Sequence, residues 1–252
     1  MNKSIAFGIA ALAMLSLPAA TNAAGFDIRL SFSNALSASQ QSAFSRAESF
    51  WESRVSGYQG DIDIAELSIS VSSAEIDGAG GSFTQSGPQR GVFESGFVLP
   101  TSGFLTFDSA DLETLSTGVL FDTIVREMAH VMGFGTMWTF NNVYVNGSGL
   151  YTGAKALAAY RAEFDPDAAF VPVELDGGAG IADILWDEAW AGGPDELMTT
   201  AIDTPTFVSL TTLASLEDIG YLLSVPIPAT VFLALTFLCF LIVIARRRKF
   251  RP

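Results

Sequence analysis

The chain carries a strongly apolar segment near each end, which leaves only its middle for a globular fold. At the N-terminus, Lys3 precedes an apolar run over residues 5–17, and Pro18 and several small residues follow it. This order is typical of a secretory signal peptide, which we expect over residues 1–23. The rest of the chain is therefore expected to be exported.

The second apolar segment runs from Ala229 to Ala245 and contains no charged residue. At about 1.5 Å per residue, a helix of this length spans roughly 26 Å, near the lower limit for crossing the hydrocarbon core of a membrane. Five Lys and Arg residues follow within residues 246–251. Because such clusters stay on the cytoplasmic side, we expect a C-terminal transmembrane helix in the inner membrane, with the preceding domain outside the cytoplasm.

The sequence VPIPA leads into this segment and supplies Val225, Pro226, Pro228 and Ala229. Together with the apolar helix and the Arg cluster, this sequence resembles a PEP-CTERM-type sorting signal of the VPxPA variety. The resemblance implies one partner, an exosortase-type membrane protease that processes proteins for display at the cell surface. A plain single-span anchor over residues 224–252 is the alternative.

Acidic residues dominate the part of the chain between the two ends. Six of the 13 Lys and Arg residues lie in the end segments, so seven remain against 27 Asp and Glu, a net charge of about −20. Because nucleic acids bind to basic surfaces, we expect no nucleic-acid partner. The single cysteine, Cys239, lies in the C-terminal apolar segment, so the domain is expected to fold without disulfides.

Residues 24–223 show the pattern of one domain. Alternating apolar residues over 26–32 predict a strand, and Ser37 with Gln40 predicts a capping box for a helix that ends at Gly57. The glycine-rich residues 78–88 are expected to form a loop.

The second half of the domain is mainly helical in its pattern. A helix is expected over residues 120–132, ended by Gly133, after a short helix that Ser109 caps. Further helices are expected near 155–163 and 209–219. Strands come first and helices later, which favours an α+β class over a doubly wound sheet.

The helix expected over 120–132 carries the residues with chemical potential. Zinc peptidases use His-Glu-x-x-His on a helix, because positions i and i+4 share a face and the Glu acts as general base. Here Glu127 and His130 occupy the general-base and second-ligand positions, whereas Arg126 occupies the first-ligand position. The pattern alone is weak, since a single histidine in a helix is more often a packed core residue.

Several further motifs accompany this helix in order: FDSADLETLSTG, REMAHVMGFGTMW, GGAGIADILWDEAWAGGPDELMT and SLEDIGY. In this order they resemble the leishmanolysin-like zinc metallopeptidases, a branch of the metzincins, and IDGAGG and GPQRG fit the bacterial members. The resemblance covers most of residues 24–223. It implies a zincin/metzincin-like domain with an active-site helix.

The resemblance also implies a distant third zinc ligand and a methionine turn below the zinc-binding site. The third position falls at Leu185, just before Trp186, and the methionine turn falls at Met198. His130 is the only histidine in the chain, so two of the three expected imidazoles are absent. A zinc ion about 4 Å from a guanidinium is repelled by roughly 8 kcal/mol at an effective dielectric of 20. We therefore expect no tightly bound zinc.

Three functions remain open from the sequence. The first is a degenerate metallopeptidase scaffold in the cell envelope, without cofactor, that binds a peptide or polymer or has a structural role, with Glu127 vestigial and Arg126 paired with Glu127, Asp187 or Glu188. The second is an active zinc metalloendopeptidase with a non-standard ligand set, such as His130 with Asp187 or Glu188. The third is a structural envelope component that binds no specific ligand.

Overall fold

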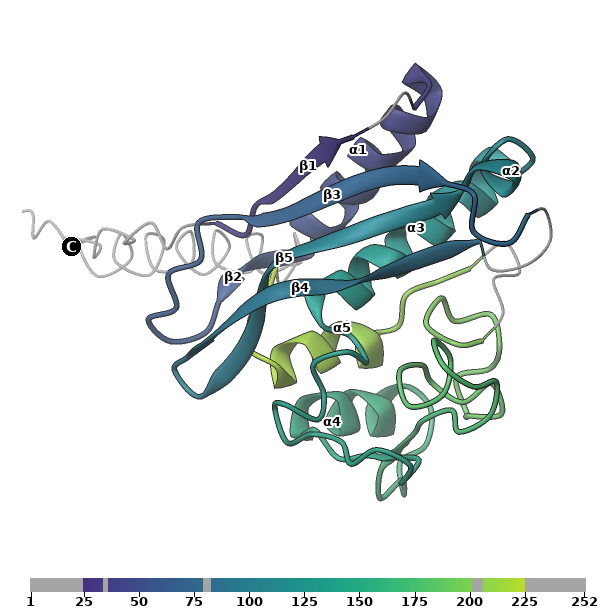
Figure 1. The fold of residues 1–252 in the computed structure, drawn as a ribbon. Coiled ribbons are helices and arrows are strands. Elements are labelled where there is room, and N and C mark those ends of the chain that lie inside the picture. Colours follow the sequence, from purple (N-terminus) through teal and green to yellow (C-terminus); the bar gives the residue numbers. More distant parts are fainter. Residues whose placement is uncertain (1–24, 34–35, 79–82, 201–205, 225–252) are drawn as a thin grey trace, which may run out of the picture.

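A four-stranded mixed sheet with the strand order β1-β3-β5-β4 forms one layer of the fold (Figure 1). The computed structural model describes residues 25–33, 36–78, 83–200 and 206–224. Strands β1, β3 and β5 are parallel, and β4 pairs antiparallel with β5 at the edge. The strands of this sheet are β1 (Ile28–Phe32), β3 (Leu67–Ala74), β4 (Thr84–Glu94) and β5 (Phe97–Asp108).

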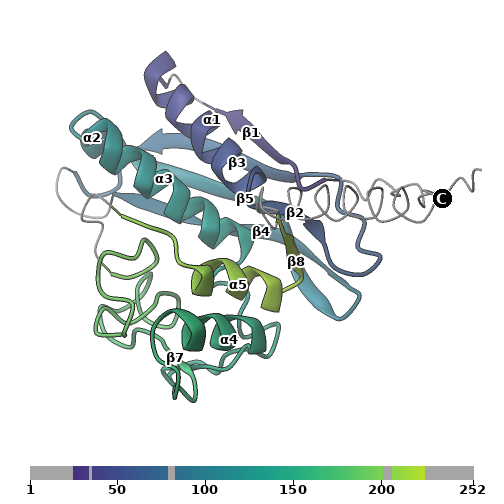
Figure 2. The same cartoon turned by 180° about the vertical axis from the view of Figure 1, so that it is seen from behind.

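Two helices, α1 (Ala38–Glu52) and α3 (Thr117–Met132), cover one face of this sheet (Figure 2). Their apolar faces are buried against it, and the indole Nε1 of Trp51 in α1 donates to the Val125 carbonyl in α3 at 3.0 Å. This bond fixes the two helices relative to each other at a point that water does not reach.

The start of α1 agrees with the sequence prediction, and its end does not. The predicted capping box is confirmed, since the backbone N–H of Ser37 donates to the Gln40 side chain and that of Gln40 donates to the Ser37 hydroxyl. The predicted end at Gly57 was wrong, because α1 ends at Glu52. The next residues form β2 (Val55–Tyr58), which pairs with the distant β8 (Tyr221–Leu223), a partner that local periodicity does not reveal.

The end of α3 is as predicted. Gly133 is the C-cap with φ of 112°, a left-handed conformation that glycine adopts without strain. The helix therefore ends at Met132, and the chain turns away from the helix axis at Gly133.

The prediction of a loop over residues 78–88 was wrong for its second part. Residues from Thr84 onward belong to β4, an edge strand whose register with β5 shifts between Pro88 and Arg90. Because proline lacks an N–H, it is tolerated in a strand at an edge or a bulge, and β4 supplies both. Glycine and proline in this stretch therefore mark an irregular edge strand.

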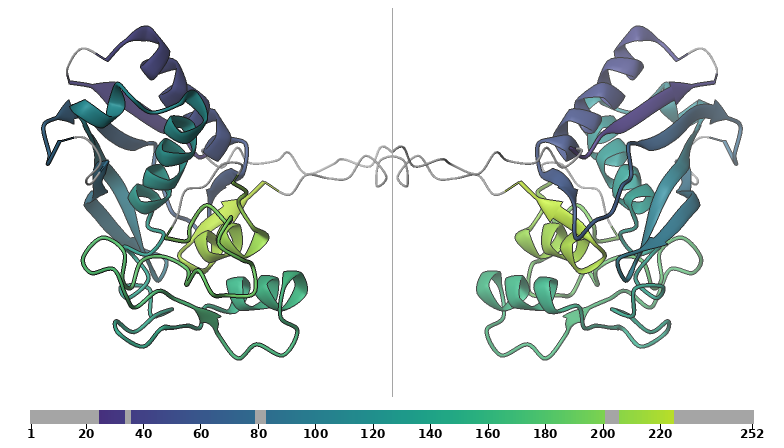
Figure 3. Two further views of the ribbon diagram at one scale, coloured as in Figure 1. Left: turned by 90° about the vertical axis from the view of Figure 1, so that its right-hand side faces the viewer. Right: turned by 90° about the vertical axis from the view of Figure 1, so that its left-hand side faces the viewer.

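Residues 134–200 and 206–220 form the lower part of the molecule, which has little regular structure (Figure 3). Two helices pack together there, α4 (Ala154–Glu163) and α5 (Leu210–Asp218), beside the short antiparallel pair β6 (Leu150–Tyr151) and β7 (Val171–Pro172). Aromatic rings fill its core, with Trp138 stacked on Trp186 at a centroid distance of 4.9 Å. Because aromatic side chains bury a large area each, these rings supply much of the packing in this part.

The predicted fold class is corrected in its membrane helix. The described residues form an α+β fold of a mixed sheet and five helices, and none of those helices is both long and apolar enough to cross a membrane. The segments expected to form the signal peptide (1–23), the sorting motif (225–229) and the transmembrane helix (229–245) lie outside the described residues.

One buried carboxylate, that of Asp108, fixes the connection between β3 and β4. Its Oδ2 accepts hydrogen bonds from the backbone N–H groups of Ile76, Asp77 and Gly78 at 2.8–3.2 Å. Its Oδ1 accepts from the N–H of Ala110, so Asp108 rather than Ser109 caps α2 (Ser109–Leu112). The hydrogen bond from Ile76, supported by the others, lowers the pKa of Asp108 to about 2.

This depressed pKa predicts a defined loss of stability in acid. Asp108 is ionised in the native state down to about pH 2, whereas in the unfolded chain it takes up a proton near pH 4. Its contribution is therefore full above about pH 4 and is lost as the pH falls toward 2. Asp108→Asn should be less stable than the wild type at pH 7 and should lack this part of the acid transition. Urea unfolding at several pH values measures both effects.

The matched control is Asp61→Asn, which changes an exposed carboxylate. It should leave the acid transition as in the wild type. Parallel pH profiles for Asp108→Asn and the wild type would contradict the assigned role of Asp108.

Candidate functional site

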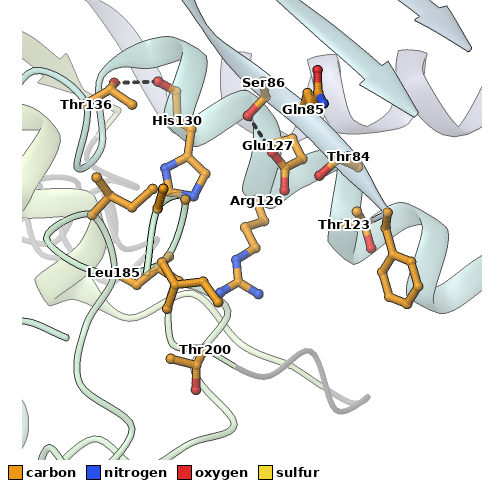
Figure 4. A pocket seen from close by; sticks show the side chains of 15 residues that line it. Thr84, Gln85, Ser86, Thr123, Arg126, Glu127, His130, Thr136, Leu185 and Thr200 are labelled. Carbon is orange, nitrogen blue, oxygen red and sulfur yellow. Dashed lines mark hydrogen bonds between the residues drawn. The ribbon is translucent and has the colours of Figure 1, made fainter. Parts of the chain in front are cut away.

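A pocket of about 520 Å³ lies between α3, the edge strand β4 and the segment around residues 179–185 (Figure 4). Four of its lining residues come from α3, at positions 123, 126, 127 and 130, and this pattern places them on one side of the helix. Strand β4 adds Thr84, Gln85 and Ser86, and the lower part adds Leu185 and Thr200. The residues from α3 are Thr123, Arg126, Glu127 and His130.

The imidazole of His130 is buried and has a defined tautomer. Its Nδ1 lies 3.0 Å from the Phe134 carbonyl, and since a carbonyl can only accept, Nδ1 carries the proton. Nε2 is therefore an unprotonated acceptor. Burial lowers the pKa of His130, because the charged form loses its hydration, although Glu127 and the Phe134 carbonyl act in the opposite direction.

The carboxylate of Glu127 faces the edge strand. It accepts a hydrogen bond from the Ser86 hydroxyl of β4 (Figure 4). This bond links α3 to the strand on the other side of the pocket. One oxygen of the group at the general-base position is thus engaged by a serine.

The guanidinium of Arg126 is buried, with 6% of the residue exposed. Its Nη2 donates to the Thr199 carbonyl. Burial lowers the pKa of Arg126, and Glu127 and Glu196 raise it. Its expected pairing with Glu127, Asp187 or Glu188 is not found, because Arg29–Glu66 is the only ion pair within the part of the chain that the structure describes.

Leu185 lies in the same pocket as Arg126 and His130 and is almost fully buried. The close approach of its segment to the end of α3 depends on Gly135, whose φ is 72° and where a Cβ would collide with the backbone of Ile184. The structure thus brings Arg126, Glu127, His130 and Leu185 around one pocket. Leucine offers only hydrocarbon at the position where the resemblance implies a third ligand.

Met198 is fully buried and does not line the pocket. Its carbonyl accepts from the backbone N–H of Trp186 at 2.8 Å, which joins its segment to the one that carries Leu185. The carbonyl of the next residue, Thr199, accepts the hydrogen bond from Arg126. Thr200, which follows it, lines the pocket.

Sequence reasoning missed Glu196, a fully buried carboxylate that holds this segment in place. It accepts from the backbone N–H groups of Met198 and Ser209 and from the hydroxyls of Ser209 and Thr212, at 2.6–3.0 Å. Burial raises the pKa of Glu196, and these donors lower it. No sequence signal separates Glu196 from the exposed Asp195 beside it, because three of the four donors lie 13 to 16 residues away.

Asp187 and Glu188 lie near Glu174, another residue that the sequence did not single out. Carboxylate oxygens of the three residues lie within 4.8 Å of one another. A hydrogen bond between Glu174 and Glu188 raises the pKa of Glu174 and lowers that of Glu188, as expected when two carboxyl groups share a proton. His130 does not belong to this group.

The residues in the pocket do not fit the zinc site that the resemblance implies. A catalytic zinc needs three protein ligands, and the pocket supplies one imidazole, a cationic guanidinium and an aliphatic side chain. Glu127 is the remaining lining side chain that could bind a metal ion, and it already accepts a hydrogen bond from Ser86. The cation of Arg126 would repel a metal ion near His130.

No protein-family model matches the chain, and no curated protein matches it in sequence. The resemblance to leishmanolysin-like peptidases therefore remains a prediction from the quoted motifs.

The environment of His130 predicts a particular NMR signature. Because it is the only histidine, its imidazole nitrogens give isolated signals in ¹⁵N-histidine-labelled protein. We expect the Nδ1–H tautomer and a pKa below the usual value of about 6.5. The unfolded chain then binds the proton first, so stability should be full above about pH 6.5 and decrease as the pH falls below it.

His130→Phe should remove this part of the pH dependence of unfolding. An Nε2–H tautomer, or a pKa at or above about 6.5 in the titration, would contradict the described environment.

Glu196 predicts a large effect on stability. Glu196→Ala leaves two backbone N–H groups and two hydroxyls without their acceptor, each at a cost of about 1–3 kcal/mol when buried. We expect the free energy of unfolding to fall by about 3 kcal/mol or more, measured by urea denaturation. Asp195→Ala, at the exposed neighbouring position, is the control and should change it by less than about 0.5 kcal/mol. Equal effects of the two substitutions would show that Glu196 does not anchor the segment.

Proposed function

We propose that this chain is a non-catalytic binding protein on a metallopeptidase-like scaffold, which holds a peptide or polymer segment in the pocket between β4 and α3. The observation that carries the proposal is the composition of the pocket. One imidazole, a buried guanidinium and a leucine line the pocket, and they occupy the three positions at which the resemblance implies metal ligands. These residues leave a pocket that can hold a ligand but do not support zinc-dependent hydrolysis.

The position of β4 supports a ligand with an extended backbone. This strand lies at the edge of the sheet, so one side of its backbone has no partner strand within the described residues. Its residues Thr84 to Ser86 line the pocket. An extended peptide can add to such an edge through main-chain hydrogen bonds, while side-chain pockets provide specificity.

The polarity and size of the pocket agree with this use. Its volume of about 520 Å³ is in the range of ligand sites in proteins. Arg126 donates, the Nε2 of His130 accepts, and the hydroxyls of Thr84, Thr123 and Thr200 can do either. This mixture of donors and acceptors suits the amide groups of a peptide.

An active peptidase with a non-standard ligand set has less support. The described acidic residues that could hold a cation together are Glu174, Asp187 and Glu188, and His130 is not among them. The structure therefore offers no assembled set for this function among the described residues.

We further propose that the protein acts outside the cytoplasm, in the cell envelope, because residues 1–23 have the pattern of a signal peptide. The VPIPA sequence and its exosortase-type partner also remain proposals.

The proposal predicts that the purified protein binds no zinc. After dialysis against micromolar zinc, elemental mass spectrometry should find a zinc content near zero. The double variant Arg126→His with Leu185→His restores three imidazoles and should bind about one zinc per chain if the pocket has the geometry of a peptidase site.

The single variant Leu185→His, which keeps Arg126, is the control and should stay nearly free of zinc. About one zinc per wild-type chain would overturn the non-catalytic function and revive the peptidase. A folded double variant without zinc would show that the pocket does not have the geometry of a zinc site.

A further inference from the structure

The guanidinium of Arg126 is a buried cation without a carboxylate partner in the described chain. The residue is 6% exposed and lines the pocket, and no ion pair of the described residues includes it. Buried charges in proteins are normally paired, because the loss of hydration is otherwise uncompensated. The acceptor found for Arg126 is a neutral carbonyl, that of Thr199.

Two acidic residues, Glu127 and Glu196, raise the pKa of Arg126, but both accept hydrogen bonds from other groups. Glu127 accepts from Ser86, and Glu196 accepts from four donors of its own segment and α5. In Figure 4, Glu127 points toward β4, whereas Arg126 points the other way, toward Thr200. The guanidinium and the carboxylate of Glu127 therefore serve different sides of the pocket.

We infer that Arg126 is a receptor for a carboxylate of the bound ligand, so that the guanidinium holds an anion where the resemblance implies a metal ion. This inference rests on the proposed function, since it names the group by which the pocket recognises its peptide. The carboxylate is either the C-terminus of the peptide or an Asp or Glu side chain. Both present the same two oxygens to the guanidinium.

The chemistry of arginine favours this ligand group. A guanidinium has five N–H donors in a planar fork that matches the two oxygens of a carboxylate. Leu185 provides an apolar wall beside it, which strengthens the attraction by excluding water. The Nε2 of His130 can accept an N–H of the same peptide.

The acidity of the domain acts against anions only at long range. At physiological ionic strength, charges separated by more than about 8 Å are largely screened, so contacts within the pocket decide the affinity. Among the described residues that line the pocket, Glu127 is the one carboxylate, and its hydrogen bond with Ser86 holds it on the far side from Arg126.

The test is affinity selection on the immobilised protein with three libraries of N-acetylated hexapeptides. The first has neutral side chains and a free C-terminal carboxylate, the second has the same side chains and a C-terminal carboxamide, and the third is a carboxamide library with one Glu. Mass spectrometry measures the retained fraction of each. We expect at least one carboxylate library to be retained about tenfold more than the neutral one, as a charge-assisted bidentate contact implies.

Arg126→Gln should remove this preference, and Arg126→Lys, which keeps the charge but loses the fork, should reduce it. The matched control is Arg161→Gln, because the Nε of Arg161 also donates to a carbonyl, that of Ala168, but lies outside the pocket. It should leave the preference unchanged. Thermal unfolding identifies any variant that does not fold, and Arg126→Lys then carries the comparison.

The outcomes separate the inference from the proposed function. Equal retention of neutral and carboxylate libraries, unaffected by changes at Arg126, would overturn the carboxylate receptor and leave the binding function standing. Retention of no library would count against both. Enrichment of the first library alone assigns the C-terminal carboxylate, and enrichment of the third alone assigns a side chain.

Discussion

The hydrogen bonds of the buried Glu196 carboxylate hold the segment that carries Thr199 and Thr200 beside the pocket. The carboxylate collects four donors from its own segment and from the start of α5, and the Thr212 hydroxyl that donates to it also accepts from the indole of Trp186. A buried carboxyl group is tolerated only when its hydrogen-bonding capacity is filled, so these groups have to stay together. The Thr199 carbonyl below Arg126 and the wall formed by Thr200 follow from that arrangement.

The upper half of the pocket is organised by α3 and the strand beside it. Three adjacent functional groups of the helix each have a different partner: Glu127 binds Ser86, His130 binds Phe134, and Arg126 binds Thr199. Because each partner lies in a different element or loop, the three side chains diverge. The guanidinium of Arg126 offers a fork of hydrogen-bond donors and has no Lewis acidity, which limits what the site can do.

Agreement between sequence and structure was best where the deciding interactions are local. The capping box of Ser37 and the glycine that ends α3 involve residues at most four positions apart, and both were predicted. Strand β2 was read as the end of a helix, because its partner β8 lies more than 160 residues away. The cap of α2 was assigned to Ser109 instead of Asp108, and the carboxylates of Glu174 and Glu196 gave no signal, since their roles depend mainly on donors or acidic neighbours brought close by the fold.

The positions and residue types along α3 already limited its chemistry before any tertiary contact was known. Positions 126, 127 and 130 fall on one side of a helix, and a single histidine allows at most one imidazole of this chain in any site. Only the tertiary structure decided what these groups contact. Ser86 is 41 residues from Glu127 and Thr199 is 73 residues from Arg126, and contacts at such separations depend on the packing of the whole chain rather than on local periodicity.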